Sequence, residues 1–75
     1  MPRLPRNISG RDLAGALVRL GFVVSRQRGS HMVLHRSDPA CRVVVPDHVS
    51  LKIGTLKSVL REAGVSVEVL LEAMK

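Results

Sequence analysis

The chain has 75 residues, of which 45% are hydrophobic, and it carries a net charge of +6. This length predicts one domain with a core of marginal size, so we expect a homodimer or a partner chain to add stability. No apolar run approaches the roughly 18 residues of a membrane span, so we expect no membrane partner. The basic residues at the start of the chain are not followed by an apolar stretch, so we also expect no secretion signal.

The single cysteine and the distribution of charge indicate the cellular location and the kind of binding partner. The single cysteine, Cys41, cannot close an internal disulfide, which favours a reducing, cytoplasmic location. Residues 1–61 contain eleven Lys and Arg against three Asp, a net charge of +8, whereas residues 62–75 have a net charge of −2. A basic body favours a polyanion such as nucleic acid as partner, but on charge alone a generically basic small protein is an equally good interpretation.

The first helix follows an extended lead-in over residues 1–8. Ser9 and Asp12 have the spacing of a capping box, so the helix begins at Ser9, and Gly21 ends it. Apolar residues recur at helical spacing and predict one buried stripe, formed by Leu13, Ala16, Leu17 and Leu20.

Three strands are expected next, over residues 22–27, 31–36 and 41–46, joined by turns at 28–30 and 37–40. Simple hairpins place Gln27 and Pro46 opposite His31, Ser25 opposite Val33, and His35 opposite Arg42. Helices should cover the face that carries Phe22, Val24, Met32, Leu34, Cys41, Val43 and Val45, with Arg26 and Arg36 toward its ends. The other face is open to water or a partner and carries Val23, Ser25, Gln27, His31, Val33, His35, Arg42, Val44 and Pro46.

A second helix is expected to open at Gly54-Thr55 and to end at Gly64, and a C-terminal helical extension covers residues 66–75. The free N–H groups at the start of the second helix, flanked by Lys52 and Lys57, could bind a phosphate, although helix capping explains Thr55 equally well. The predicted fold class is therefore α+β, within a single domain over residues 1–75.

His31 is the residue for which catalysis is expected. It follows the Gly29-Ser30 turn at the rim of the open face, and an imidazole titrates near neutral pH, as a general base requires. Arg26, Arg28 and Lys52 are candidates for binding a substrate phosphate. Ser30 either orients the imidazole or donates to that phosphate, but a turn residue bonded to its own backbone is an equal alternative.

The nucleic acid expected as substrate is RNA. Phe22 is the only aromatic residue and should lie in the core, so the chain offers no aromatic platform on which bases could stack. Recognition then depends on shape, phosphates and 2′-hydroxyls. A histidine base without a metal suits RNA, because the 2′-OH is itself the nucleophile that a base must deprotonate.

No metal and no cofactor are expected. His31 and His35 share a face but lie four residues, about 13 Å, apart along a strand, and Cys41 belongs to the other face. His48 is a secondary candidate, because the loop after the third strand could bring it, or the carboxylate of Asp47, near His31. An exposed loop histidine without a role is the simpler interpretation of His48.

Four segments together resemble the HicA-type mRNA interferase toxins, over about residues 9–66. They are Leu20-Gly21-Phe22, Arg28-Gly29-Ser30-His31, Val43-Val44-Val45-Pro46 with His48 after it, and Gly54-Thr55-Leu56. The resemblance implies a double-stranded-RNA-binding-domain-like fold and metal-independent endoribonuclease activity on mRNA. It also implies that His31 is the catalytic base and that a HicB-type antitoxin neutralises the protein, but it assigns no role to His48.

Two other functions are weighed against this toxin nuclease. A non-catalytic module that binds structured RNA would use the same charge and fold, and its RNA binding would survive loss of His31. An antitoxin-type protein-interaction domain would dock an acidic partner through the open face and would have no affinity for RNA.

Overall fold

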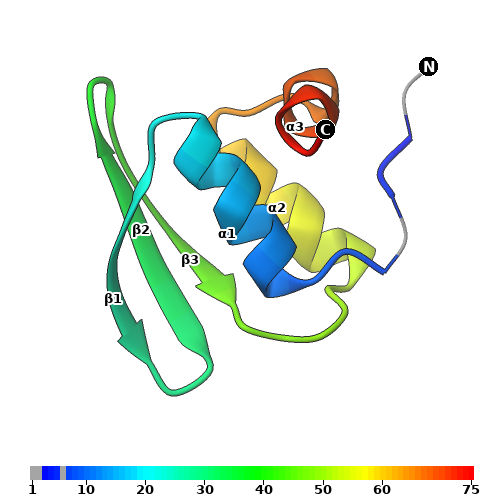
Figure 1. Cartoon of the computed structure of the whole chain (residues 1–75), viewed down its shortest axis with the longest axis horizontal. Coiled ribbons are helices and arrows are strands. Elements are labelled where there is room, and N and C mark those ends of the chain that lie inside the picture. Colours follow the sequence, from blue (N-terminus) through cyan, green and yellow to red (C-terminus); the bar gives the residue numbers. More distant parts are fainter. Residues whose placement is uncertain (1–2, 6) are drawn as a thin grey trace.

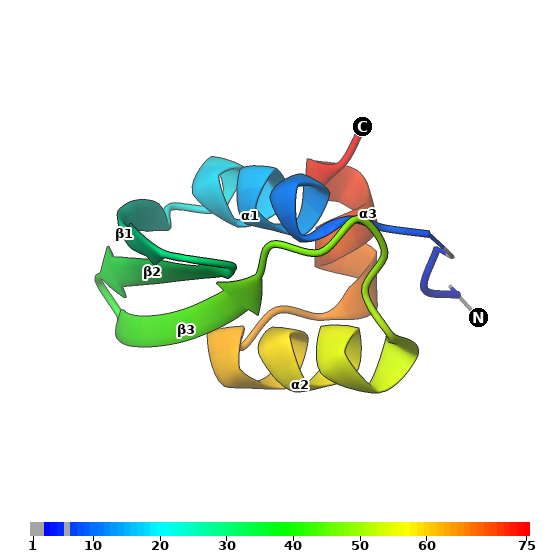
Figure 2. The ribbon, with the colours of Figure 1, turned by 90° about the horizontal axis from the view of Figure 1, so that it is seen from below.

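The computed structural model describes residues 3–5 and 7–75, so Met1, Pro2 and Arg6 of the expected lead-in lie outside the described residues. The elements are, in chain order, α1 (Gly10–Arg19), β1 (Val23–Arg28), β2 (His31–Ser37), β3 (Ala40–Pro46), α2 (Ile53–Ala63) and α3 (Val67–Ala73). The strands form one antiparallel sheet in the order β1-β2-β3. Both α1 and α2 lie on the same side of this sheet (Figures 1 and 2). The predicted α+β class, with its order of helix, three strands, helix and terminal helix, is confirmed.

The core lies between the helices and the covered face of the sheet, because each element turns one apolar side toward it. The predicted stripe of α1 is buried at Leu13, Ala16 and Leu17, with Leu20 half-buried at its end. Phe22, directly before β1, is also buried, and the sheet and the other two helices contribute Met32, Leu34, Val43, Val45, Leu56, Val59, Leu60, Ala63 and Leu70. Each large side chain fully buried in this way stabilises the fold by about 1.5–3 kcal/mol relative to exposure.

The helix ends follow the sequence signals, with one exception. Ser9 and Asp12 form the predicted capping box, in which the Asp12 N–H donates to Ser9 Oγ at 3.0 Å. Gly64 ends α2 with a φ of 70°, and the Ser66 hydroxyl accepts a hydrogen bond from the backbone at the start of α3. The start of α2 was expected at Gly54-Thr55 but lies at Ile53, after Lys52 as a cap that makes no side-chain hydrogen bond.

The register of the sheet is partly as predicted. β2 and β3 pair as expected, with His31 opposite Pro46 and His35 opposite Arg42. β1 and β2 do not form the simple hairpin, because a β-bulge at Ser25 shifts the pairing and places Arg28 opposite His31. The turn therefore has two residues instead of three, and its first residue, Gly29, has a φ of +56°, as is typical of a type II′ turn.

The bulge changes the face of the side chains that follow it, which corrects three predicted positions. Arg26 pairs with Val33 and lies on the open face, not on the covered one. Gln27 pairs with Met32 instead of His31, and so lies on the opposite side to the one predicted. Ser25 does not pair with Val33 through its backbone, but its Oγ donates to the Val33 carbonyl at 3.1 Å and supports the bulge.

The segment after β3 is held closely against the start of α1. The Gly10 N–H donates to the His48 carbonyl at 2.8 Å, and a Cβ at Gly10 would collide with the Pro46 carbonyl oxygen. The Leu51 N–H donates to the Ile8 carbonyl at 2.8 Å, which ties the described part of the lead-in to the same segment. None of the helices that the structure describes is long and apolar enough to cross a membrane.

Candidate functional site

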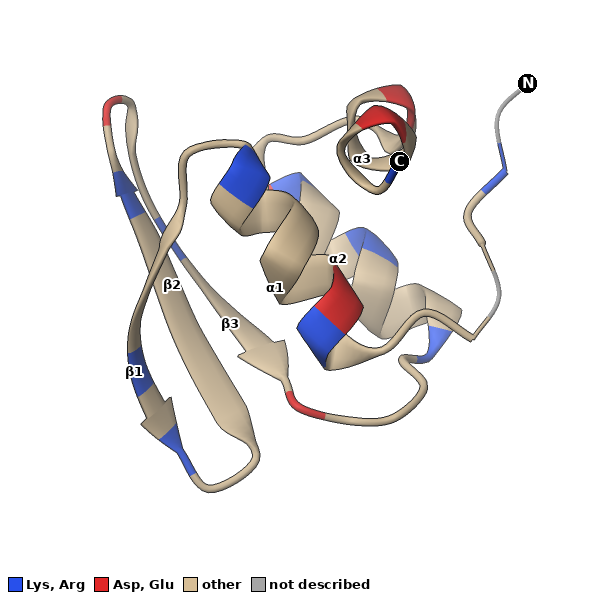
Figure 3. Ribbon diagram, in the orientation of Figure 1, with Lys and Arg blue, Asp and Glu red and all other residues tan. Residues whose placement is uncertain are grey.

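The uncovered face of the sheet carries nearly all the cationic and imidazole groups of the strands. Strand pairing arranges its side chains in three cross-strand rows, Arg28–His31–Pro46, Arg26–Val33–Val44 and Val23–His35–Arg42. Successive rows lie two residues apart on β2, which is about 7 Å. The strands of the described chain contain no Asp or Glu, and Figure 3 shows Lys and Arg positions along them with acidic positions only in the adjoining turns.

His31 is exposed at the first position of β2, on this open face. Its cross-strand neighbour on β1 is Arg28, and side chains directly opposite one another have Cβ atoms about 4.5–5.5 Å apart. A guanidinium beside an exposed imidazole can hold a phosphate while the imidazole accepts a proton from a neighbouring hydroxyl. The arrangement therefore has the elements of acid–base chemistry on a phosphodiester.

Arg26 and Arg42 border a shallow pocket on the same face. This pocket has a volume of about 250 Å³, and Ser25 and Val33 complete its lining. Arg26 reaches it only because of the bulge, which is why the regular alternation of the sequence placed this side chain on the wrong face. Arg42 was assigned to the open face but not to any site, because no feature of the sequence connected it with Arg26.

Asp47 connects the loop after β3 to the β1–β2 turn. Its N–H donates to the Ser30 carbonyl at 2.6 Å, and its carboxylate accepts from Gln27 Nε2 at 3.0 Å and from Arg11 Nε at 3.3 Å. The Asp47 side chain is only 18% exposed, whereas that of Arg11 is 78% exposed. Sequence reasoning considered Asp47 only as a group near His31. Its contacts with Gln27 and Arg11 depend on the bulge and on a contact across 36 positions, which local patterns do not reveal.

The other site residues predicted from the sequence differ in how close they lie to His31. Ser30 is exposed in the turn directly before His31, and its carbonyl is bonded to Asp47. His48 is exposed, and its carbonyl is bonded to the start of α1. Lys52 caps α2 and Lys57 lies within it, and the start of α2 is well separated from the β1–β2 turn in both views (Figures 1 and 2). The structure does not bring these two lysines together with His31.

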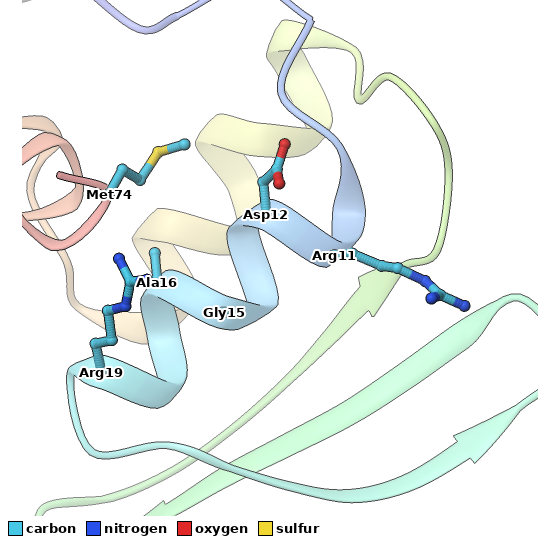
Figure 4. Close-up of a pocket in the computed structure, with 6 residues that line it drawn as sticks. All are labelled: Arg11, Asp12, Gly15, Ala16, Arg19 and Met74. Carbon is cyan, nitrogen blue, oxygen red and sulfur yellow. The ribbon is translucent and has the colours of Figure 1, made fainter.

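A second hollow, of about 190 Å³, lies between α1 and α3 (Figure 4). Its arginines are already engaged, since Arg19 Nη1 donates to the Ala73 carbonyl at 2.7 Å and Arg11 points toward the strands, where it reaches Asp47. Asp12, which also lines it, would repel an anion. The open sheet face is therefore the better candidate for binding a polyanion. In the described parts of the chain, no three His, Cys, Asp or Glu side chains gather where they could hold a metal ion.

Comparison with known protein families gives a match over most of the chain. A family model described as the HicA toxin of bacterial toxin–antitoxin systems matches residues 10–65. This span runs from the start of α1 to just beyond the end of α2, so it includes the whole sheet and the open face. A search of curated proteins finds no match.

Proposed function

The chain belongs to the HicA toxin family of bacterial toxin–antitoxin systems, and from this premise we propose that it is a metal-independent mRNA endoribonuclease. His31 is the general base of this reaction. The observation that carries the proposal is the exposed imidazole of His31 next to Arg28, on a sheet face that carries no acidic side chain among the described strands.

The proposed reaction is an internal transesterification of the RNA backbone. His31 removes the proton from a 2′-OH, and the 2′-oxygen attacks the adjacent phosphorus in line. The bond from phosphorus to the 5′-oxygen breaks and that oxygen takes up a proton from solvent, which leaves one fragment with a 2′,3′-cyclic phosphate and the other with a 5′-hydroxyl. Arg28 holds the reacting phosphate and stabilises the negative charge that grows on its oxygens.

Other cationic groups are assigned to binding. Arg26 lies one row from Arg28 on the same face and binds the RNA backbone there. Ser30, in the turn beside His31, donates to the phosphate or orients the imidazole. Lys52 and Lys57 contact RNA away from the reacting phosphate, because Lys52 precedes α2 and Lys57 lies within it.

The partners follow from the family. A toxin of such a system has an antitoxin partner, and we propose that it is a HicB-type protein. Its mRNA substrate places the protein in the cytoplasm. The small size of the core leads us to propose that a homodimer or the antitoxin adds stability.

The proposal is tested by inducing the full chain in bacterial cells as wild type, His31→Ala and His35→Ala. Wild type and His35→Ala should arrest growth and generate new mRNA ends, whereas His31→Ala should do neither. His35 is the matched control, because it is an exposed histidine on the same strand and face. Circular dichroism of the purified variants checks that each retains its fold.

The two alternative functions are distinguished when the RNA affinity of the purified variants is measured as well. A non-catalytic RNA-binding module would bind RNA in a salt-sensitive way in all three forms and would produce no new RNA ends. A protein-interaction domain would show no affinity for RNA. Growth arrest by His31→Ala equal to that of wild type would remove the catalytic assignment.

A further inference from the structure

We infer that Arg26 and Arg42 form a second phosphate-binding subsite, which holds a single RNA strand beside the cleaved bond on the open sheet face. This inference rests on the proposed function, which identifies RNA as the ligand. It extends the site from the row that contains His31 across the sheet to β3, and it gives Arg42 a role.

The first support is the position of the guanidinium groups. Arg28, Arg26 and Arg42 stand in three successive rows of the open face, in a line that starts on β1 and ends on β3. Because rows are about 7 Å apart, the line extends about 14 Å from the His31 row, further than one phosphate group can reach. A chain of phosphates can contact all three rows at once.

The second support is the pocket between Arg26 and Arg42. Its volume of about 250 Å³ is ample for a phosphate group, and Val33 provides an apolar wall next to the two guanidinium groups. Arg42 makes no hydrogen bond or ion pair with another side chain in the described part of the chain, so its donors are free for a ligand. The same is true of Arg26 within the described residues.

The third support is the chemistry of the surrounding surface. The face exposes Val23 and Val44, with exposed fractions of 59% and 37%, between its arginines. The guanidinium groups can bind the phosphates of an unpaired strand, and the apolar side chains next to them can contact its sugars and bases, without the stacking that an aromatic ring provides. The reaction also favours a single strand, because in-line attack by a 2′-oxygen requires a backbone that can leave A-form geometry.

The test measures binding without cleavage, using full-length His31→Ala protein and a fluorescein-labelled single-stranded RNA of about ten nucleotides. Adding Arg42→Gln or Arg26→Gln should raise the Kd about three- to tenfold and reduce the slope of log Kd against log salt concentration by roughly 0.7. Arg61→Gln is the matched control, because it removes the same charge from an exposed position on α2. It should change the Kd by less than roughly twofold.

The inference is overturned if Arg42→Gln has no larger effect on the Kd than Arg61→Gln. It is also overturned if Arg42→Gln leaves RNA affinity unchanged but abolishes binding of the antitoxin, since the face would then serve an acidic protein. If the arginine effects appear but wild type produces no RNA cleavage, the subsite stands and the proposed nuclease activity fails. The two proposals therefore fail by different measurements.

Discussion

At Asp47, three parts of the chain meet. The residue follows β3, its carboxylate accepts hydrogen bonds from Gln27 on β1 and Arg11 on α1, and its backbone N–H donates to Ser30 beside His31. A largely buried carboxylate with such contacts fixes the position of the β1–β2 turn relative to the helical layer. Asp47 therefore acts on the proposed reaction as a positioning residue, through the turn that carries the imidazole.

Asp47→Ala should separate positioning from RNA binding. Loss of the carboxylate should lower the free energy of unfolding by about 1–2 kcal/mol, because Gln27 loses a hydrogen-bond acceptor. RNA cleavage should slow several-fold, whereas RNA affinity should not fall, because a negative charge near the substrate has been removed. Urea denaturation, cleavage rates and fluorescence anisotropy measure these three quantities.

Glu62→Ala provides the control for this prediction, because it removes the same charge from an exposed position on α2. It should leave the cleavage rate unchanged. If Asp47→Ala and Glu62→Ala have equal cleavage rates, the positioning role is refuted.

Two glycines of α1 should respond in opposite ways to the same substitution. A methyl group at Gly10 would collide with the backbone of Pro46, so Gly10→Ala should destabilise the protein by about 1–3 kcal/mol. Gly15 has open space around its Cα, so Gly15→Ala should stabilise it by about 0.5–1 kcal/mol through helix propensity. Urea denaturation of both variants checks the signs, and stabilisation by Gly10→Ala would contradict the close approach of α1 to β3.

Among the elements, the register of the β2–β3 hairpin could be predicted, whereas that of β1 could not. Both strands of the hairpin run one residue further toward the turn than expected, β2 to Ser37 and β3 from Ala40. Alternating apolar residues on β2 and β3, such as Leu34 and Val43, exclude a shift by one residue, because it would expose the core face, and the short turn at 38–39 fixes the rest of the register. β1 has no such constraint after Val24, since the next four residues are polar. The bulge at Ser25 therefore leaves no trace in the hydrophobic pattern, and the faces of Arg26 and Gln27 were predicted wrongly.

For the candidate site, the position of His31 could be predicted from the sequence, but its neighbours could not all be predicted. The position of His31 depends on the well-determined β2–β3 register, so its place on the open face could be inferred correctly from the sequence. The neighbours of His31 depend on β1 and on the path of the loop after β3. This is why the sequence associated both Arg28 and Lys52 with His31, whereas the structure places Arg28 beside it and Lys52 at the start of α2.

The terminal helix α3 contributes to the core beyond the end of the family match. Leu70 is fully buried, and Arg19 of α1 donates to the carbonyl of Ala73 at the end of α3. Leu70→Ala should lower the free energy of unfolding by about 2–5 kcal/mol, because it leaves a cavity in the core. Val69→Ala, at a position that is 44% exposed, should lower it by less than about 1 kcal/mol. Equal unfolding midpoints in urea would show that α3 does not pack as described.

In the whole molecule, the acidic residues of the described chain lie outside the strands. The helices carry both acidic and basic residues, whereas the described strands carry only cationic and neutral side chains (Figure 3). A polyanion is therefore drawn to the open sheet face, on the opposite side of the sheet from the core. Composition left a polyanionic partner and a generically basic small protein as equal interpretations, whereas the arrangement of the strands identifies the surface that would meet a polyanion.

The central claim is that His31 on this face deprotonates a 2′-OH, and mass spectrometry of the cleavage products tests it most directly. Purified wild type and His31→Ala proteins are incubated with one defined single-stranded RNA, and the ends of the fragments are identified. The account predicts that wild type yields fragments with 2′,3′-cyclic phosphate and 5′-hydroxyl ends, and that His31→Ala yields none. Fragments with 3′-hydroxyl and 5′-phosphate ends, or cleavage by His31→Ala at the wild-type rate, would contradict it.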